Sequence, residues 1–223
     1  ITCACAVATL MEDIDGVALD PYFLFATARH LTKKVIGNVG VDLRAVCSAV
    51  KEFGCLEAKS APFTRDTPRH IFADWSRWKE LPNFDTLCKN AFSHRKTEFF
   101  LVSGPHENMF DIVRAALYAY RKERRGIVAI MKWRVEWMDA EHGIIPIEKF
   151  AGGFHTAVKI VGQTHIDQEM YLVLQPNFGR TVGNKGFFYA ARSTVNRSLR
   201  GGAFMFLNRR GVMEKTGMEL PDP

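Results

Sequence analysis

Three side chains in this sequence are of the types that together carry out nucleophilic chemistry. Cys3 lies at the start of the chain, His155 follows 152 positions later, and Asn177 follows 22 positions after that. A thiolate attacks a carbonyl carbon, a histidine transfers the proton and an asparagine orients the imidazole, so this set can form a Cys-His-Asn site. Because the residues are far apart in sequence, the elements that carry them must pack against one another.

Each of the three residues also has a purely structural interpretation. Cys3 at a helix N-terminus would have a lowered pKa, but a free cysteine is most often a small buried apolar residue. His155 can be a strand-end histidine bonded to backbone, and Asn177 can be a turn residue before Phe178 and Gly179. Both interpretations stay open at this stage. The remaining cysteines of the later chain are assigned to packing: Cys47, Cys55 and Cys88.

Hydrophobic spacing predicts helices in the first third of the chain. The apolar pattern from about 2 to 11 has a helical period, and Asp20-Pro21 and Asp42 are start signals for two more helices, the last closed by Gly54. Residues 60–96 contain prolines and tryptophans, and we expect irregular connections there with a short helix or two.

The second half of the sequence is rich in strand patterns. We expect a helix from about Phe110 to near Gly126, with strands at about 99–102, 127–131, 155–161, 171–174, 187–190 and 203–207. A helical lobe followed by a β lobe predicts an α+β architecture with any site in the cleft between the lobes. The expected boundary divides a single domain 1–223 into a mainly helical part, about 1–97, and a mainly β part, about 98–223.

The composition is that of an ordinary globular protein. The 223 residues are 47% hydrophobic, and no apolar run approaches the ~20 residues that a membrane span requires. The first ten residues have no basic segment and no cleavage site, so we do not interpret them as a signal peptide, and the abrupt helical start suggests a piece of a larger protein or assembly. The net charge of +6 is spread along the chain, so a nucleic-acid partner rests on charge alone.

The cysteine count bears on the compartment and on metals. Five cysteines without a disulfide-framework spacing indicate free thiols, and hence an intracellular, reducing compartment. No Cys/His cluster has the spacing of a zinc site, so we expect neither a metal nor a cofactor.

The order of these parts resembles the papain family of cysteine peptidases. The strand Ala157-Val158-Lys159-Ile160-Val161-Gly162 looks like the family's AVLIVG strand, and Gly179, Gly183 and Gly186-Phe187-Phe188 fall where the family has WGxxWGxxGYF. The segments 20–24 and 41–53 are similar to the family's LSPQYL and SIRDALKALKEFG segments. The resemblance implies a papain-like two-lobe fold, with an N-terminal helical lobe and a C-terminal antiparallel β lobe on either side of a cleft.

The resemblance also assigns roles and exposes departures. It implies Cys3 as nucleophile, preferred over Cys5 because Thr2-Cys3 resembles the G-T-C start of divergent members, with His155 as base and Asn177 as its orienting partner. In ungapped alignment, however, the three catalytic slots fall on other residues: Ala4, Thr156 and Pro176. The active interpretation then requires backbone irregularities beside both His155 and Asn177, because a one-residue slip sends a strand side chain to the opposite face.

These departures decide the functional prediction. The lead hypothesis is a papain-fold pseudo-peptidase that serves as a binding or structural module and holds a protein or peptide in the inter-lobe cleft. The alternative is an active, divergent cysteine endopeptidase that uses Cys3, His155 and Asn177, and a basic nucleic-acid-binding module is the minor alternative. Gly40 matches the glycine that lets a substrate backbone approach the helical lobe, although a plain turn explains it equally well.

Overall fold

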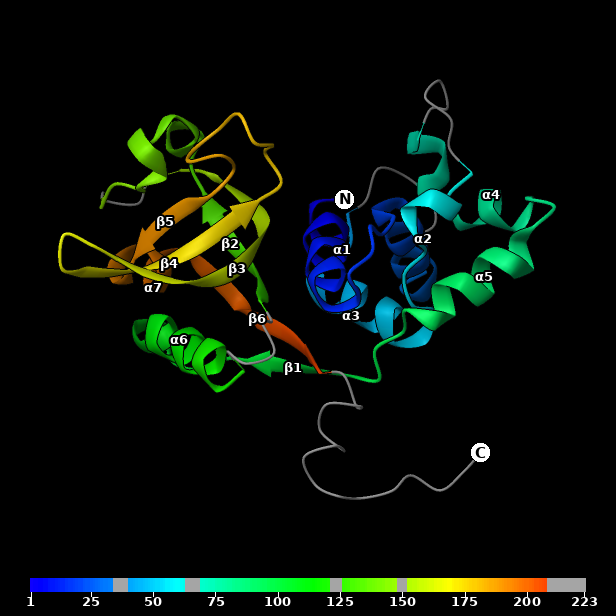
Figure 1. Cartoon of the computed structure of the whole chain (residues 1–223), viewed down its shortest axis with the longest axis horizontal. Coiled ribbons are helices and arrows are strands. Elements are labelled where there is room, and N and C mark those ends of the chain that lie inside the picture. Colours follow the sequence, from blue (N-terminus) through cyan, green and yellow to red (C-terminus); the bar gives the residue numbers. More distant parts are fainter. Residues whose placement is uncertain (34–39, 63–68, 121–125, 148–151, 208–223) are drawn as a thin grey trace, which may run out of the picture.

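The chain folds into a helical half and a sheet half, which Figure 1 shows side by side. This computed structural model describes residues 1–33, 40–62, 69–120, 126–147 and 152–207. The first half contains the helices α1 (Thr2–Asp15), α2 (Pro21–Leu31), α3 (Leu43–Glu52), α4 (Trp75–Lys79) and α5 (Phe84–Ser93). We call this group of five helices the helical lobe.

Both predicted helix start signals are present. The Asp20 carboxylate accepts a hydrogen bond from the Phe23 N–H at 2.7 Å, and the Asp42 carboxylate accepts one from the Ala45 N–H at 2.7 Å. An N-cap carboxylate satisfies a backbone donor that has no partner within the helix, so these residues fix where α2 and α3 begin. Gly54 follows α3 with a φ of 80°, the left-handed conformation that closes a helix at low cost.

The second half is built on one antiparallel sheet with the strand order β1-β6-β2-β3-β4-β5. The strands are β1 (Glu98–Val102), β2 (Ile127–Trp133), β3 (Phe154–Ile166), β4 (Glu169–Pro176), β5 (Phe188–Ala191) and β6 (Leu199–Leu207). Two further helices, α6 (Met109–Ala119) and α7 (Arg192–Ser198), pack on this sheet. We call the sheet with α6 and α7 the β lobe, and the α+β prediction is confirmed.

The structure differs from the predicted elements in several places, among them β6, which begins at Leu199, four residues before the predicted strand. Helix α6 ends at Ala119, and the expected continuation through 121–125 lies outside the described residues. Strand β3 runs on to Ile166 and joins β4 through a two-residue turn in which Asp167 and Gln168 both have positive φ. Helix α7 was not predicted, because its seven largely polar residues have no clear helical period.

Two hydrophobic cores lie on opposite faces of β2 and β3. Val128 and Ala157 belong to the core that includes α1, α2 and α3, whereas Ala129 and Val158 belong to the core that includes α6. Successive strand residues point to opposite faces, so this alternation assigns residues 154–160 of β3 to a face. We call the two faces of the sheet the α1 face and the α6 face.

Candidate functional site

The pleat of β3 places His155 on the α1 face. His155 lies two residues before Ala157, which packs in the core of the helical lobe, and it is paired directly with Lys132 of β2. This part of the ladder is regular, because the register irregularity of β3 lies between Ile160 and Gly162. The His155 side chain is exposed, so it reaches the inter-lobe side without the local bulge that the sequence alignment required.

Thr156, the slot residue of β3 in the ungapped alignment, lies on the α6 face. Thr156 is paired with Met131 and Pro176 with Val158, and these partners belong to the core on the α6 face. Thr156 is 2% exposed, and its hydroxyl has no hydrogen-bond partner among the described residues. Ala4 is buried in the core of the helical lobe and Pro176 borders the cavity described below, so these three residues do not share one surface.

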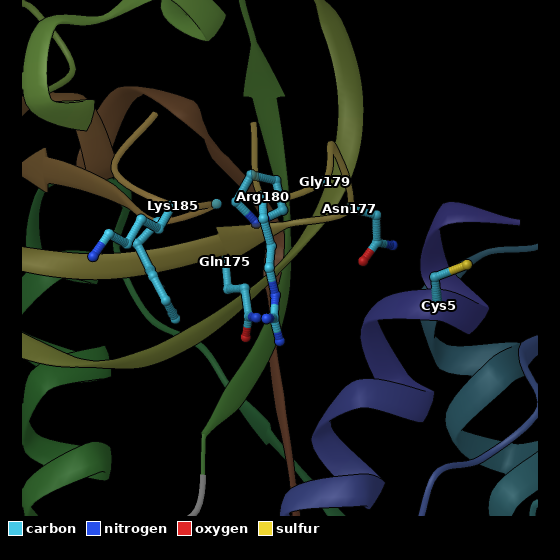
Figure 2. Close-up of a pocket in the computed structure, with 9 residues that line it drawn as sticks. Cys5, Gln175, Asn177, Gly179, Arg180 and Lys185 are labelled. Carbon is cyan, nitrogen blue, oxygen red and sulfur yellow. The ribbon is translucent and has the colours of Figure 1, made fainter. Parts of the chain in front are cut away.

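Asn177 joins the two lobes at the end of β4. It follows Pro176, is exposed, and its Nδ2 group donates a hydrogen bond of 3.1 Å to the backbone carbonyl of Thr2 in α1. Figure 2 shows the amide nitrogen of Asn177 directed toward α1 and its oxygen directed away from it. Asn177 thus holds the first turn of α1 against the β lobe.

The rotation of α1 determines which residue of its first turn faces the sheet. Asp13 forms an ion pair of 2.8 Å with Lys159 on the α1 face of β3, so its side of α1 faces the β lobe. Thr2, Ala6 and Thr9 precede Asp13 at the four-three-four spacing of one helical stripe. Leu10 also lies close to the start of β2, because a Cβ atom at Gly126 would be 3.4 Å from its Cδ1, and Ala6 and Cys3 precede Leu10 by four and seven positions. Thr2 and Cys3 therefore lie on either side of the direction in which α1 faces the sheet.

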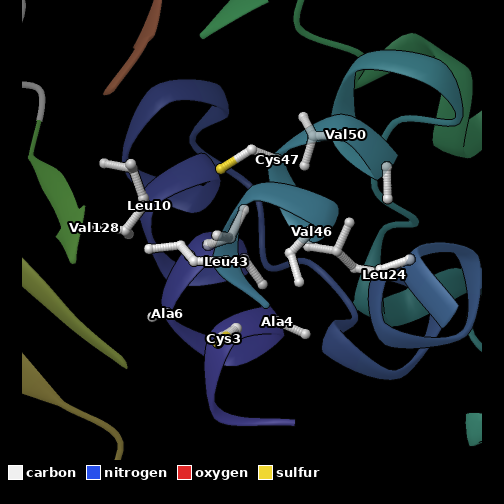
Figure 3. Close-up of a cluster of buried hydrophobic side chains, with 14 of the residues drawn as sticks. Cys3, Ala4, Ala6, Leu10, Leu24, Leu43, Val46, Cys47, Val50 and Val128 are labelled. Atoms are coloured by element: carbon white, nitrogen blue, oxygen red, sulfur yellow. The ribbon is translucent and has the colours of Figure 1, made fainter. Parts of the chain in front are cut away.

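Cys3 lies in the interior of the helical lobe. It is 9% exposed and belongs to the buried cluster in Figure 3 that includes Leu43 and Cys47 of α3. Burial raises the pKa of the Cys3 thiol, because a thiolate loses hydration in an apolar setting. This buried, apolar environment therefore disfavours the thiolate, the nucleophilic form of Cys3.

A cavity of about 650 Å³ opens beside the first turn of α1 (Figure 2). It lies between Cys5 and the connection that joins β4 to β5. The lining residues are Cys5, Gln175, Pro176, Asn177, Gly179, Arg180, Lys185, Gly186 and Phe187. We call this cavity the inter-lobe pocket.

The inter-lobe pocket combines a poorly ionised thiol with two cations. Burial raises the pKa of the Cys5 thiol, so Cys5 is largely protonated at neutral pH. Arg180 and Lys185 are both exposed, and neither forms an ion pair with any residue that the structure describes. Asp and Glu are absent from the described lining, so the local charge is positive.

The structure brings together only part of the predicted site. His155 and Asn177 both lie on the inter-lobe side, whereas Cys3 lies in the helical core and Gly40 is exposed with open space where a Cβ atom would lie. Sequence reasoning missed the pocket residues Gln175, Arg180 and Lys185.

Metal binding has no candidate in the described part of the chain. Among those residues, no three His, Cys, Asp or Glu side chains gather as a ligand set. All five cysteines are free thiols. In the same described ranges, no helix combines the length and the apolar character that crossing a membrane requires.

Solved structures similar to this chain are cysteine proteases. Xylellain, a cysteine protease from Xylella fastidiosa, is similar over 93% of this chain and 79% of its own, with a TM-score of 0.69 and 17% identity. Bromelain from Ananas comosus, in complex with the E64 inhibitor, is similar over 93% of this chain and 87% of its own, with a TM-score of 0.61 and 13% identity. The proform of the ragweed cysteine protease Amb a 11 has a TM-score of 0.62 and 15% identity, with 93% of this chain and 59% of the proform covered.

The chain therefore has the papain-like cysteine-protease fold. No protein-family model and no curated protein sequence matches it. The identities to the solved structures are 13–17%, so the similarity lies in the fold. Function has to be argued from the residues at the site.

Proposed function

We propose that this chain is a papain-fold pseudo-peptidase, a binding module that holds a segment of a partner protein between its lobes. The observation that carries the proposal is the burial of the candidate nucleophile. Cys3 is 9% exposed within the core of the helical lobe, and burial raises the pKa of its thiol. A buried, protonated thiol is a poor nucleophile, so the site offers shape and polarity rather than a thiolate.

The test is covalent labelling of the intact chain with an epoxysuccinyl probe, followed by mass-spectrometric mapping of the modified residue. We expect slow labelling at a rate that His155→Ala leaves unchanged, because no imidazole activates a thiol in this arrangement. Stoichiometric modification of Cys3 or Cys5 that falls by about a hundredfold or more in His155→Ala would overturn the proposal.

Two cysteine variants make this labelling test site-specific. Cys3→Ser and Cys5→Ser each remove one candidate thiol from the first turn of α1. We expect the partly exposed Cys5 to account for most of the slow labelling, since Cys3 is 9% exposed. Unfolding measurements on each variant ensure that a change in labelling does not report a loss of the fold.

A second candidate function is supported by the positions of His155 and Asn177. Both lie on the inter-lobe side of the sheet, and Asn177 contacts the first turn of α1. An active endopeptidase would use Cys3 as nucleophile, His155 as base and Asn177 to orient it, after a rotation of the first turn that exposes the Cys3 thiol. Cleavage of a denatured protein that is abolished in both Cys3→Ser and His155→Ala would establish this function.

The remaining expectations are part of the same proposal. Five free thiols favour a reducing, intracellular compartment. A nucleic-acid-binding role has no support beyond the net charge of +6.

A further inference from the structure

We propose that the inter-lobe pocket binds an acidic, extended segment of a partner protein, with Arg180 and Lys185 as its two cationic contacts. This inference rests on the proposed function, because it names the chemistry of the segment that the binding module holds. It concerns the β4–β5 side of the pocket, which contains neither Cys3 nor His155.

The charge balance of the pocket is the first argument. Arg180 and Lys185 both line the pocket and have no carboxylate partner within the described ranges, whereas the nearly buried Lys159 on the α1 face is paired with Asp13. Unpaired cations around a concave site attract anionic ligands, and this electrostatic attraction becomes stronger as the bound ligand excludes water. A carboxylate is the group that an arginine fork binds best within a protein partner.

The directions of the two cations indicate an extended ligand. Figure 2 shows Arg180 extending alongside Gln175, while Lys185 extends to the opposite side of the loop, away from α1. Two diverging cations match two separated carboxylates better than they match one small anion. The amides of Gln175 and Asn177 also line the pocket, with Asn177 on the α1 side of Arg180 (Figure 2), and they can bond to the backbone of the bound segment.

The backbone conformation of Lys185 is an independent observation. Its φ of 53° is in the left-handed region, where glycine and asparagine are favoured and lysine carries a cost. Gly186 follows with a φ of 90°, and a Cβ atom there would lie 3.1 Å from the Gly179 carbonyl oxygen, so the loop must fold back tightly at this point. A lysine at the strained position is explained if its side chain contacts a ligand.

The size and lining of the pocket favour a peptide over a nucleic acid. A volume of about 650 Å³ accommodates a few side chains of an extended segment. Pro176 and Phe187 supply apolar surface for such side chains. A nucleic-acid site needs a longer row of cations that follows the phosphates, and this pocket presents two.

The experiment compares two fluorescein-labelled decapeptides by fluorescence anisotropy at one fixed salt concentration. One alternates alanine with glutamate, and the other alternates alanine with glutamine. We expect the intact chain to bind the glutamate peptide at least about tenfold more tightly. Arg180→Gln combined with Lys185→Asn should reduce this ratio to about one, and because asparagine tolerates the left-handed conformation, that variant should fold at least as stably.

A charge-matched control distinguishes binding at the inter-lobe pocket from an effect of the net charge of the protein. Lys51→Gln with Lys79→Gln removes the same two charges from exposed positions on α3 and α4, and it should preserve the tenfold ratio. A ratio below about threefold in the intact chain, or an equal loss in the control, would overturn the proposal. Tighter binding of fluorescein-labelled decathymidylate that is lost in the Arg180→Gln/Lys185→Asn variant would overturn it in favour of a nucleic acid.

The outcome is independent of the test of the proposed function. Epoxysuccinyl labelling reports the state of the thiols, and peptide discrimination reports the charge of the pocket. If the chain proves to be an active peptidase, mass spectrometry of the decapeptides after incubation reveals cleavage, and the two cations can still be tested as the source of selectivity. If both peptides bind equally while labelling stays independent of His155, the acidic-segment inference alone is wrong.

Discussion

The two ends of α1 differ in how the polar groups around them are paired. At its C-terminal end, the Glu12 carboxylate accepts a hydrogen bond from the Leu19 N–H, Asp13 pairs with Lys159, and Asp15 pairs with His94 and Lys96. At its N-terminal end, α1 has no side-chain cap, and the pocket beside it contains cations without described partners.

We infer from this difference that the C-terminal end of α1 contributes to stability, whereas its N-terminal end borders the proposed binding site. Carboxylates in the last turn lie at the negative end of the helix dipole, which is unfavourable unless cations compensate them. Each of the three carboxylates there has a fixed partner, so this end serves stability. Beside the other end, Arg180 and Lys185 line the inter-lobe pocket without a described carboxylate partner, which is the basis for assigning that pocket as a binding site.

The largest expected effect is that of Asp15→Ala, which removes a paired carboxylate from the C-terminal end of α1. Lys96 is 5% exposed and forms its ion pair with Asp15, which also bonds to His94 Nδ1 at 3.0 Å. Removing Asp15 leaves a nearly buried ammonium group without a partner, so the free energy of unfolding should fall by about 3–5 kcal/mol. Urea denaturation followed by circular dichroism measures this change.

The matched control is Arg77→Ala on α4. Arg77 and Glu80 form an exposed ion pair at 3.0 Å, and exposed pairs contribute only about 0–1 kcal/mol. If Asp15→Ala costs no more than Arg77→Ala, the C-terminal end of α1 is not a stabilising network and the contrast between the two ends is wrong.

The second prediction concerns acid stability at the same end of the helix. Hydrogen bonds from Lys59 and His94 lower the pKa of Glu57 from 4.5 to about 2. Because the folded value is the lower one, Glu57 contributes stability above pH 4.5, and this contribution is lost as the pH falls toward 2. Glu57→Gln should therefore lose less stability than the native chain between pH 5 and pH 2.5.

Lys59→Met sharpens this pH prediction. Lys59 is the largest cause of the lowered pKa, and its ammonium lies 2.7 Å from the Glu57 carboxylate. Thermal unfolding at half-unit pH steps should show a pH dependence for Lys59→Met between those of the native chain and Glu57→Gln. Identical curves for all three proteins would mean that Glu57 titrates alike in the folded and unfolded states.

The same contrast explains what the sequence could predict. The helix starts at Asp20 and Asp42 were predictable because N-capping is a local hydrogen bond between a carboxylate and a backbone N–H three residues later. The strand 157–162 was likewise predictable from its run of buried residues. In both cases the geometry is determined by residues close together in the sequence, so it can be predicted without knowledge of the tertiary fold.

The site depended on geometry that the sequence does not contain. Cys3 lies in the first turn of α1, and only the packing of α1 in the helical lobe determines that its thiol is buried. Likewise, His155 and Thr156 alternate along β3, and only the contact of Ala157 with the helical lobe assigns a face to each. The pocket cations were missed because Arg180 and Lys185 lie in a connection whose path is set by positive-φ positions, Lys185 among them.

The smallest expected effect comes from the N-terminal end, with Asn177→Ala. The side chain is exposed and donates one hydrogen bond of 3.1 Å to the Thr2 carbonyl, so its removal should lower the free energy of unfolding by only about 0.5–1 kcal/mol. Because the amide also borders the pocket, the same variant should weaken binding of the glutamate decapeptide while leaving the glutamate-to-glutamine ratio unchanged. Urea denaturation and anisotropy on one preparation measure both quantities. A stability loss as large as that of Asp15→Ala would mean that this end of α1 is fixed as firmly as the other, which would contradict its assignment as the end left open for a partner.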